Sequence, residues 1–293
     1  MSMDFLKRWF DRPVRPRVVV LGNQKGGSGK STAAMHLTVG LLHCGYGVGS
    51  VDLDSGQATL SHFVENRKRF AETSGAPLAM PTHRRVESSS DKSLAAAEAE
   101  EAAAVAEAFE ALLDRDYIVV DTPGSDTFLS RLGHVLADTL ITPVNDSYLD
   151  LDVLVRIDPD GKTITGPSGY SVAVLDRWGL RMMVGGRPLD WIVIRNRLAH
   201  LHTRNHRHLE TLLHKLAPAL GFRLAPGFGE RVIFRENFVQ GLTILDQPEP
   251  SKWRLPSSSH SAARKEVWAL MEEIGLSEGG RRATVPAAKV SAG

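Results

Sequence analysis

The stretch GNQKGGSGKST, residues 22–32, carries the residue types that bind phosphate groups. Its glycines allow successive backbone N–H groups to turn inward around an anion, a turn that side chains would obstruct. Lys30 stands where it can reach the β and γ phosphates of a nucleotide, and the Ser31 hydroxyl that follows is a candidate Mg²⁺ ligand. The residues expected to contact ATP are Gly26, Gly27, Ser28, Gly29, Lys30, Ser31 and Thr32.

A second lysine, Lys25, departs from the usual phosphate-loop pattern, in which a glycine stands where this chain has Gln24. The phosphates of one nucleotide are already served by Lys30, the backbone amides and Mg²⁺. A second ammonium group at the outer edge of the loop therefore has little to do in its own site. On the residues alone, Lys25 is interpreted as a solvated lysine that acts on the phosphates at long range.

Three aspartates follow apolar runs and are candidates for the chemistry beside the phosphates. Asp121 ends the run YIVV, at the carboxyl end of a predicted parallel strand, where such folds bind ligands. We expect Asp121 to hold a water on Mg²⁺; the alternative is an aspartate that starts the turn before Pro123. Asp52 and Asp54 end the run VGSVDL, and we expect one of them to orient the attacking water. Alternatively, one of the pair is only a helix cap or a turn former.

The elements that must position these residues follow from hydrophobic patterning. Short apolar runs typical of buried parallel strands occur at residues 17–21, 48–53, 117–120, 139–142, 191–194 and, more weakly, 222–225. The first run precedes the glycine loop, and residues 31–44 after the loop have helical spacing. The pattern predicts an α/β fold with a doubly wound, mostly parallel sheet and helices on both faces, as in P-loop NTPases.

Three parts are expected along the chain: a flexible leader over 1–16, a single ATPase domain over 17–277 and a disordered tail over 278–293. Within the domain, residues 93–113 are strong helix formers, whereas 84–91 and 158–169 carry loop and turn signals. The apolar side of FLKRWF in the leader could touch a membrane or a partner groove, but so short a helix is marginal, which favours a flexible leader.

Composition excludes several classes of protein. The chain has 293 residues, 42% of them hydrophobic, a net charge of +1 and a single cysteine, Cys44. One cysteine excludes internal disulfides and a cysteine-held iron–sulfur cluster within the chain. Because no run approaches the roughly 18 apolar residues that span a bilayer, we expect a cytoplasmic protein without a stable membrane anchor.

A local excess of basic residues lies between Arg181 and Lys215, with seven Lys/Arg against two acidic residues. Such an excess, with no aromatic residues interleaved among the basic ones for base stacking, predicts sequence-independent binding of double-stranded DNA, and a solvated basic helix is the alternative. His202 and His206 have metal-ligand spacing, but no carboxylate or cysteine pattern accompanies them. The arginines expected to contact DNA are Arg197, Arg204, Arg207 and, beyond this segment, Arg223.

Three motifs together resemble a known family. KGGSGKST is similar to the deviant Walker A box of the ParA/MinD ATPases, DLD to their switch I and DTPG to their switch II. Further blocks, among them FVENR, TPVNDSYLD and WIVIRNRLA, resemble the branch of that family that regulates the bacterial division site. The similar blocks extend over about residues 17–277, nearly the whole chain.

The resemblance implies roles that the residues alone leave open. In this family the residue that corresponds to Lys25 reaches across an ATP-bound homodimer to the nucleotide of the partner, so Lys25 becomes a catalytic candidate. Asp54 would act on the hydrolytic water, and Asp52 would lie nearer Mg²⁺, with Ser31 and Asp121. Asn196 matches an asparagine that contacts the purine; otherwise it is a turn residue at a strand end.

The same resemblance implies a cellular role: nucleoid association with a polar gradient, recruitment by a ParB-type centromere-binding protein and inhibition of the tubulin-like division protein FtsZ. A ParA-type ATPase that partitions chromosomes or plasmids is the alternative within the family. An ATP-dependent carboxylate-activating synthetase on the same fold and a non-hydrolysing scaffold are more distant alternatives.

Overall fold

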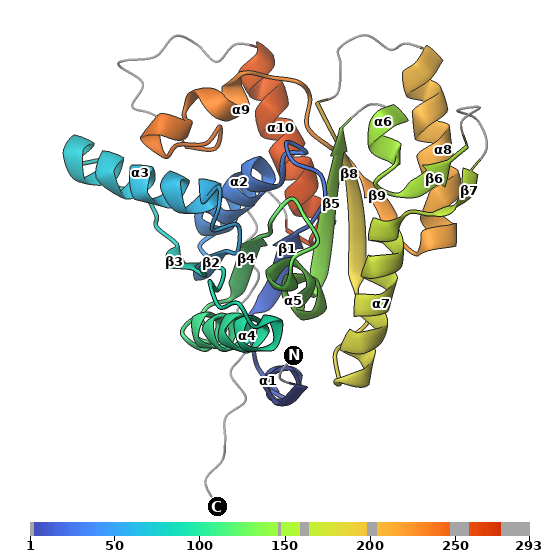
Figure 1. The fold of residues 1–293 in the computed structure, drawn as a ribbon. Coiled ribbons are helices and arrows are strands. Elements are labelled where there is room, and N and C mark those ends of the chain that lie inside the picture. The colour runs from blue at the N-terminus through green and yellow to red at the C-terminus, as the bar shows by residue number, and fades with distance from the viewer. Residues whose placement is uncertain (1–2, 146–147, 159–163, 198–203, 247–257, 277–293) are drawn as a thin grey trace, which may run out of the picture.

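A seven-stranded sheet forms the centre of the chain in the computed structural model, which describes residues 3–145, 148–158, 164–197, 204–246 and 258–276 (Figure 1). Every neighbouring pair of strands is parallel. In spatial order the strands are β3 (Thr82–Arg85), β2 (Val48–Asp52), β4 (Tyr117–Asp121), β1 (Arg17–Leu21), β5 (Thr139–Asn145), β8 (Asp190–Asn196) and β9 (Arg223–Ala225). Because β1 lies between β4 and β5, the glycine loop that follows β1 opens at the middle of the carboxyl edge of the sheet.

Helices pack on both faces of the sheet, which confirms the predicted doubly wound α/β fold (Figure 1). The first face carries α1 (Met3–Phe10), α4 (Leu94–Glu110), α5 (Phe128–Leu136), α7 (Gly169–Met183) and α8 (Arg204–Leu220). The second face carries α2 (Lys30–His43), α3 (Thr59–Ser74), α9 (Ile233–Glu236), the 3-10 turn η1 (Phe238–Gln240) and α10 (Ser258–Glu273). A short helix, α6 (Tyr148–Leu151), follows β5.

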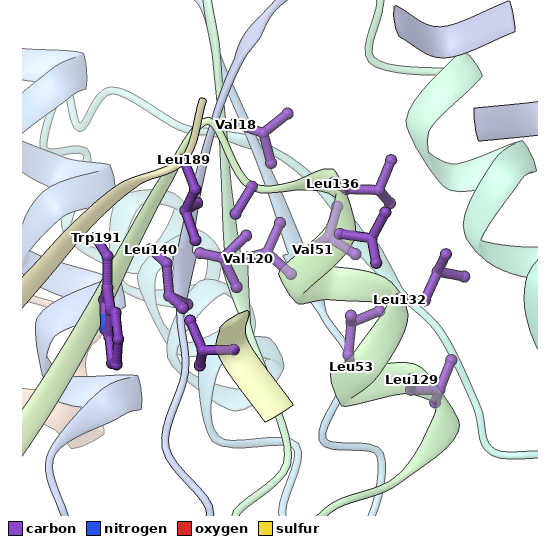
Figure 2. Close-up of a cluster of buried hydrophobic side chains, with 14 of the residues drawn as sticks. Val18, Val51, Leu53, Val120, Leu129, Leu132, Leu136, Leu140, Leu189 and Trp191 are labelled. Atoms are coloured by element: carbon purple, nitrogen blue, oxygen red, sulfur yellow. The ribbon is translucent and has the colours of Figure 1, made fainter. Parts of the chain in front are cut away.

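Alternating side chains of the strands build two hydrophobic cores. In β1, Val18 and Val20 belong to the core of the first face, whereas Val19 and Leu21 belong to that of the second. Figure 2 shows part of the first core, in which side chains of the sheet and of α5, such as Leu132, fill one layer. Burying each such side chain stabilises the fold by about 1.5–3 kcal/mol, so both faces hold the carboxyl ends of the strands in place.

Two segments that were expected to lack regular structure contain strands. The edge strand β3 lies at the start of the stretch predicted as a loop, and it pairs with β2 in register from Gly49↔Thr82 to Asp52↔Arg85. Its sequence, THRR, has no apolar run because an edge strand is only partly covered. In the other stretch predicted as a loop, 158–169, β7 (Ile164–Pro167) pairs in antiparallel orientation with β6 (Val155–Ile157), which lies just before that stretch.

The leader differs from the flexible segment that the sequence predicted, because residues 3–10 form α1. Phe5, Leu6 and Trp9 are buried in the first core, and the Trp9 ring meets Phe109 of α4 edge-on at 5.2 Å between centroids. An isolated helix of this length is marginal in water, so tertiary packing supplies its stability. The apolar side chains considered for a membrane or a partner groove therefore belong to the core.

The predicted tail, 278–293, lies outside the described residues. Across the part of the chain that the structure describes, no helix combines the length and the apolar character needed to cross a membrane.

Candidate functional site

The glycine loop joins β1 to α2 and presents the start of that helix to an anion. Helix α2 begins at Lys30, and its N-cap residue Gly29 has a left-handed backbone (φ 97°) and no side chain to cap the first turn. A Cβ atom at Gly29 would lie 2.2 Å from the Nδ2 atom of Asn196. Asn196 ends β8 and donates a hydrogen bond from Nδ2 to the Ser28 carbonyl oxygen at 2.7 Å. The uncapped N–H groups of the first turn therefore remain available to a phosphate.

A buried asparagine that the sequence analysis did not identify holds the start of the loop. Asn23 accepts a hydrogen bond at Oδ1 from the Lys25 backbone N–H (2.8 Å) and donates from Nδ2 to the Pro143 carbonyl oxygen (2.6 Å). The Tyr170 hydroxyl donates to the carbonyl oxygen of Gly22 at 2.8 Å. The sequence signal for Asn23 was a polar residue two positions after the apolar strand β1, but its partner Pro143 lies far along the chain.

Lys30 is buried inside the loop that it follows. Lys30 is only 7% exposed, and its Nζ atom donates a hydrogen bond to the Lys25 carbonyl oxygen at 3.4 Å. Burial lowers the pKa of Lys30, and the carboxylates of Asp121 and Asp54 oppose that shift. The structure thus brings together the loop lysine and two of the predicted aspartates, and a charged lysine held in this way suits a bound phosphate.

Asp121, at the end of β4, is fully buried. Neither oxygen of its carboxylate is satisfied by a hydrogen bond within the described part of the chain. Burial raises the pKa of Asp121 to about 7, against the opposing influence of the Ser31 hydroxyl and the Lys30 ammonium group. A buried carboxylate that makes no close hydrogen bond is costly, and a cation supplies the missing interaction. The oxygen donors of Asp121 and Ser31 therefore fit Mg²⁺, which favours oxygen ligands and few carboxylates.

Asp52 does not match the metal-ligand role that the resemblance implied. Its Oδ1 atom accepts the Asp54 backbone N–H at 3.0 Å, and its Oδ2 atom accepts both the backbone N–H and the hydroxyl of Ser61 at 2.9 Å each. Ser61 lies in the first turn of α3, whose N-cap residue, Ala58, has no side-chain acceptor. Asp52 thus caps α3 from the neighbouring strand, as the helix-cap alternative described, and we leave it out of the metal site.

Asp54 lies at the rim of the site and is only partly buried. Its Oδ1 atom accepts the Gln57 backbone N–H at 3.3 Å, and its charge raises the pKa of both Lys30 and Asp121. A carboxylate that faces the phosphate loop without being enclosed remains able to contact a water molecule.

Lys25 forms an ion pair with Asp150 of α6, within its own chain. The Lys25 side chain is 42% exposed, whereas that of Asp150 is 9% exposed. The sequence analysis did not identify Asp150, although its place shortly after the buried strand β5 puts it at the same edge of the sheet as the glycine loop. The loop therefore carries one lysine turned inward, Lys30, and one on its outer side, Lys25.

The predicted DNA-contacting arginines lie at opposite edges of the sheet. Arg197 directly follows β8, is exposed and has a left-handed backbone (φ 54°) beside the glycine loop. Arg204 begins α8 and Arg207 lies in its first two turns, near that same edge; their side chains lie outside the described part of the structure, as does His202. The 17 residues of α8 rise about 26 Å, at roughly 1.5 Å per residue, toward the start of β9.

Arg223 stands at that far edge and is a correction to the predicted DNA-contacting set. It donates from Nε to Asp190 Oδ1 at 2.8 Å and also pairs with Glu273 of α10. These carboxylates raise the pKa of Arg223, the hydrogen bond to Asp190 contributing most. Arg223 lies at the opposite edge of the sheet from Arg197, and two carboxylates already neutralise its charge. We therefore leave Arg223 out of the set of arginines expected to contact DNA.

Comparisons with known proteins identify a family and several solved structures to which this chain is similar. A family model described as ATPase MipZ matches residues 17–278. The ATP complex of McdA from Cyanothece is similar to this chain with a TM-score of 0.62 and 19% identity, over 92% of this chain and 100% of that one. A plasmid partition protein from Borrelia burgdorferi B31 bound to AMPPNP has a TM-score of 0.54 and 16% identity, over 88% and 100%.

The septum site-determining protein MinD from Pyrococcus horikoshii OT3, complexed with Mg-ADP, has a TM-score of 0.51 and 16% identity, over 89% of this chain and 98% of that one. At these identities the solved structures establish a shared fold. A search of curated proteins gives no match.

Proposed function

The chain belongs to the MipZ ATPase family, and we propose that it is an ATP-dependent dimerising switch that controls where the division septum forms. The observation that carries the proposal is the buried Asp121 carboxylate, left without a hydrogen bond beside Ser31 and Lys30. That arrangement suits a nucleotide phosphate with a divalent cation. A MinD that shares the fold was solved with Mg-ADP, and a McdA was solved with ATP, which supports the same ligands here.

In the proposed hydrolysis the protein supplies position and charge. The amides of the glycine loop and of the first turn of α2 cradle the phosphates, and Lys30 neutralises the β and γ groups. Ser31 and Asp121 would hold Mg²⁺, which when bound offsets the charge that develops on the phosphates. Asp54, at the rim, orients the attacking water, and Asn196 contacts the purine. Hydrolysis resets the switch.

Dimerisation is proposed to use Lys25. The phosphates in its own site are served by Lys30, and Lys25 lies on the outer side of the loop with a side chain 42% exposed. A second copy that docks over the nucleotide would let Lys25 leave Asp150 for the phosphates of the partner. ATP binding and dimer formation then become one coupled event.

The proposed dimer binds double-stranded DNA without sequence preference. Arg197, Arg204 and Arg207 lie near the nucleotide edge of the sheet, so a dimer that forms over that edge places two such sets side by side. Family membership supports the remaining partners, a ParB-type centromere-binding protein and FtsZ, and a cytoplasmic, nucleoid-associated distribution with a polar gradient.

Assembly of FtsZ in the presence of the purified protein tests the proposal. We expect ATP-bound protein to lower the mass of sedimented FtsZ polymer, and the hydrolysis-deficient Asp54→Ala variant to lower it further because its dimer persists. Polymer mass that is unaffected by either protein with ATP would refute the division role. The alternative, a ParA-type partition ATPase, is supported by the shared fold of the Borrelia plasmid partition protein. A fluorescent fusion separates the two: a polar gradient with a midcell minimum indicates septum control, and a band that travels with one DNA cargo indicates partition.

A further inference from the structure

A chain of buried and partly buried hydrogen bonds connects the edge strand β3 to the turn that carries Asp54. His83 of β3 lies opposite Ser50 of β2 in the register of the two strands, and its Nδ1 atom is 2.9 Å from the Ser50 hydroxyl. On its other side, His83 Nε2 is 3.0 Å from the hydroxyl of Ser61 in α3. The Ser61 hydroxyl donates to Asp52, whose other oxygen accepts the Asp54 N–H. The links therefore run from His83 through Ser61 and Asp52 to Asp54.

The chemistry of these groups gives every hydrogen bond in the chain a direction. A serine hydroxyl has one proton, and that of Ser61 goes to the Asp52 carboxylate. His83 must therefore donate to Ser61 from Nε2, which leaves Nδ1 as the acceptor of the Ser50 hydroxyl. Burial lowers the pKa of His83 to about 4, with Arg84 and Arg85 lowering it further against Glu65, so a neutral ring is expected at neutral pH.

The tautomer of His83 decides where the Ser61 proton points. If Nε2 were an acceptor, the Ser61 hydroxyl could turn away from Asp52 and donate to the ring instead. The buried Ser50 hydroxyl can donate to Nδ1 and so is compatible with a ring that carries its proton on Nε2. Asp52 then keeps the Ser61 hydroxyl on one oxygen and the Asp54 N–H on the other. The backbone at Asp54 is thereby held in one geometry.

We propose that His83 is a positioning residue for hydrolysis: through Ser61 and Asp52 it holds the turn that aims Asp54 at the attacking water. The proposal rests on the proposed role of Asp54. His83 touches neither nucleotide nor water; it acts on the turnover rate through geometry, to which phosphoryl transfer is sensitive because catalysis there is mostly positioning.

Steady-state ATP turnover of His83 variants tests the proposal, with DNA present and with dimer mass measured by light scattering. His83→Phe removes both ring nitrogens, and we expect kcat to fall roughly tenfold or more with an unchanged KM for ATP and an unchanged ATP dimer. His83→Gln keeps an N–H donor within reach of Ser61, and we expect it to restore most of kcat. The matched control is His62→Gln, which alters an exposed histidine of α3 whose Nδ1 atom lies 3.6 Å from Glu65, and it should not change kcat.

Two further measurements keep the test informative if His83→Phe is unstable. Ser61→Ala breaks the same link from the other side, so it should lower kcat to a similar extent, and the double variant should lose little more than either single one. Long-range ¹H–¹⁵N spectra of the wild-type protein should show the Nε2–H tautomer of His83.

Several outcomes would overturn the role of His83. These are a wild-type kcat in His83→Phe, an equally low kcat in His83→Gln, additive losses in the double variant, or an Nδ1–H tautomer. If Asp54→Ala itself retains full turnover, the proposed function fails instead. A loss of turnover in Asp54→Ala together with normal turnover in His83→Phe rejects the positioning role alone.

Discussion

Lys25 and Asp150 form an ion pair across the outer side of the glycine loop, within a single chain. Lys30, five residues on, turns inward to the carbonyl oxygen of Lys25. One loop thus holds a lysine for its own anion and a second lysine that already has a carboxylate partner in the absence of another copy. If Lys25 serves the partner's nucleotide, dimerisation must exchange one anionic partner for another.

Lys25→Ala is expected to bind ATP and remain monomeric. In this variant Lys30 and the N-terminus of α2 still contact the ATP bound to the same chain. The cation that reaches the ATP of the partner is missing. Light scattering with ATP measures the mass, and nucleotide titration measures binding. A dimer of normal mass would reject the cross-site role.

Asp150→Asn is expected to favour the ATP dimer modestly, because it removes the carboxylate that competes for Lys25. The Lys25 side chain is 42% exposed, so each pair is worth at most about 1 kcal/mol. A dimer exchanges two such pairs, one in each copy, so its dissociation constant should fall by at most roughly 30-fold. Sedimentation velocity at several ATP concentrations measures this constant. Asp176→Asn, at an exposed position of α7, is the control and should leave it unchanged. A weaker dimer in Asp150→Asn would indicate that Asp150 supports the dimer instead of competing with it.

Asp54→Ala is expected to accumulate as an ATP-bound dimer with turnover reduced by about a hundredfold, since the residue that orients water in phosphoryl transfer is lost while the phosphate contacts stay. Phosphate release and dimer lifetime are measured together. Undiminished phosphate release would remove Asp54 from the mechanism.

Mg²⁺-dependent ATP binding is expected to strengthen with pH, because the pKa of Asp121 is raised to about 7 and only the ionised carboxylate suits a cation. Between about pH 6 and about pH 8 the ionised fraction rises roughly tenfold, and the apparent affinity should follow. Asp121→Asn should bind Mg-ATP weakly and lose this dependence, and ATP binding in EDTA should show no such rise in either protein.

The same pKa shift predicts how the ligand-free protein responds to pH. Because the folded-state pKa is raised, the folded protein binds more protons than the unfolded chain between about pH 4 and about pH 7. This contribution to the free energy of unfolding is therefore fully present at low pH and is lost as pH rises through 7. Denaturant unfolding without Mg²⁺ should show a flatter pH dependence over this window in Asp121→Asn than in wild type.

Replacing Arg204 and Arg207 together by Ala is expected to weaken DNA binding with the dimer mass unchanged. Because the dimer carries two copies of each arginine, the slope of log affinity against log salt should fall in magnitude by about four. Arg223→Ala is the informative control: it should leave DNA binding intact and lower stability, because Asp190 and Glu273 lose their partner. Filter retention at two salt concentrations and thermal unfolding measure these effects. Equal loss of DNA binding in Arg223→Ala would return that residue to the interface.

Local patterning determined the fold and the phosphate site. The order of an apolar run, glycines, a lysine and helical spacing over residues 17–44 needs no distant partner to form a strand, a loop and a helix. Asp121 was predictable for the same reason, because a residue that ends a buried parallel strand must lie at the carboxyl edge. Family resemblance supplied the roles proposed for Lys25 and Asn196, which their spacing alone did not suggest.

Tertiary structure alone decided the features that depend on partners far apart along the chain. Asp52 caps a helix because it accepts hydrogen bonds from Ser61 of α3, and Arg223 is excluded from the proposed DNA-binding set because it pairs with Glu273 of α10. Helix α1 forms because Phe109 and its neighbours cover Trp9, although its own length makes it marginal. Periodicity reports which side of an element is apolar, but it carries no information on which distant residue will complete a hydrogen bond or an ion pair. Those pairings exist only once the sheet has brought the elements together.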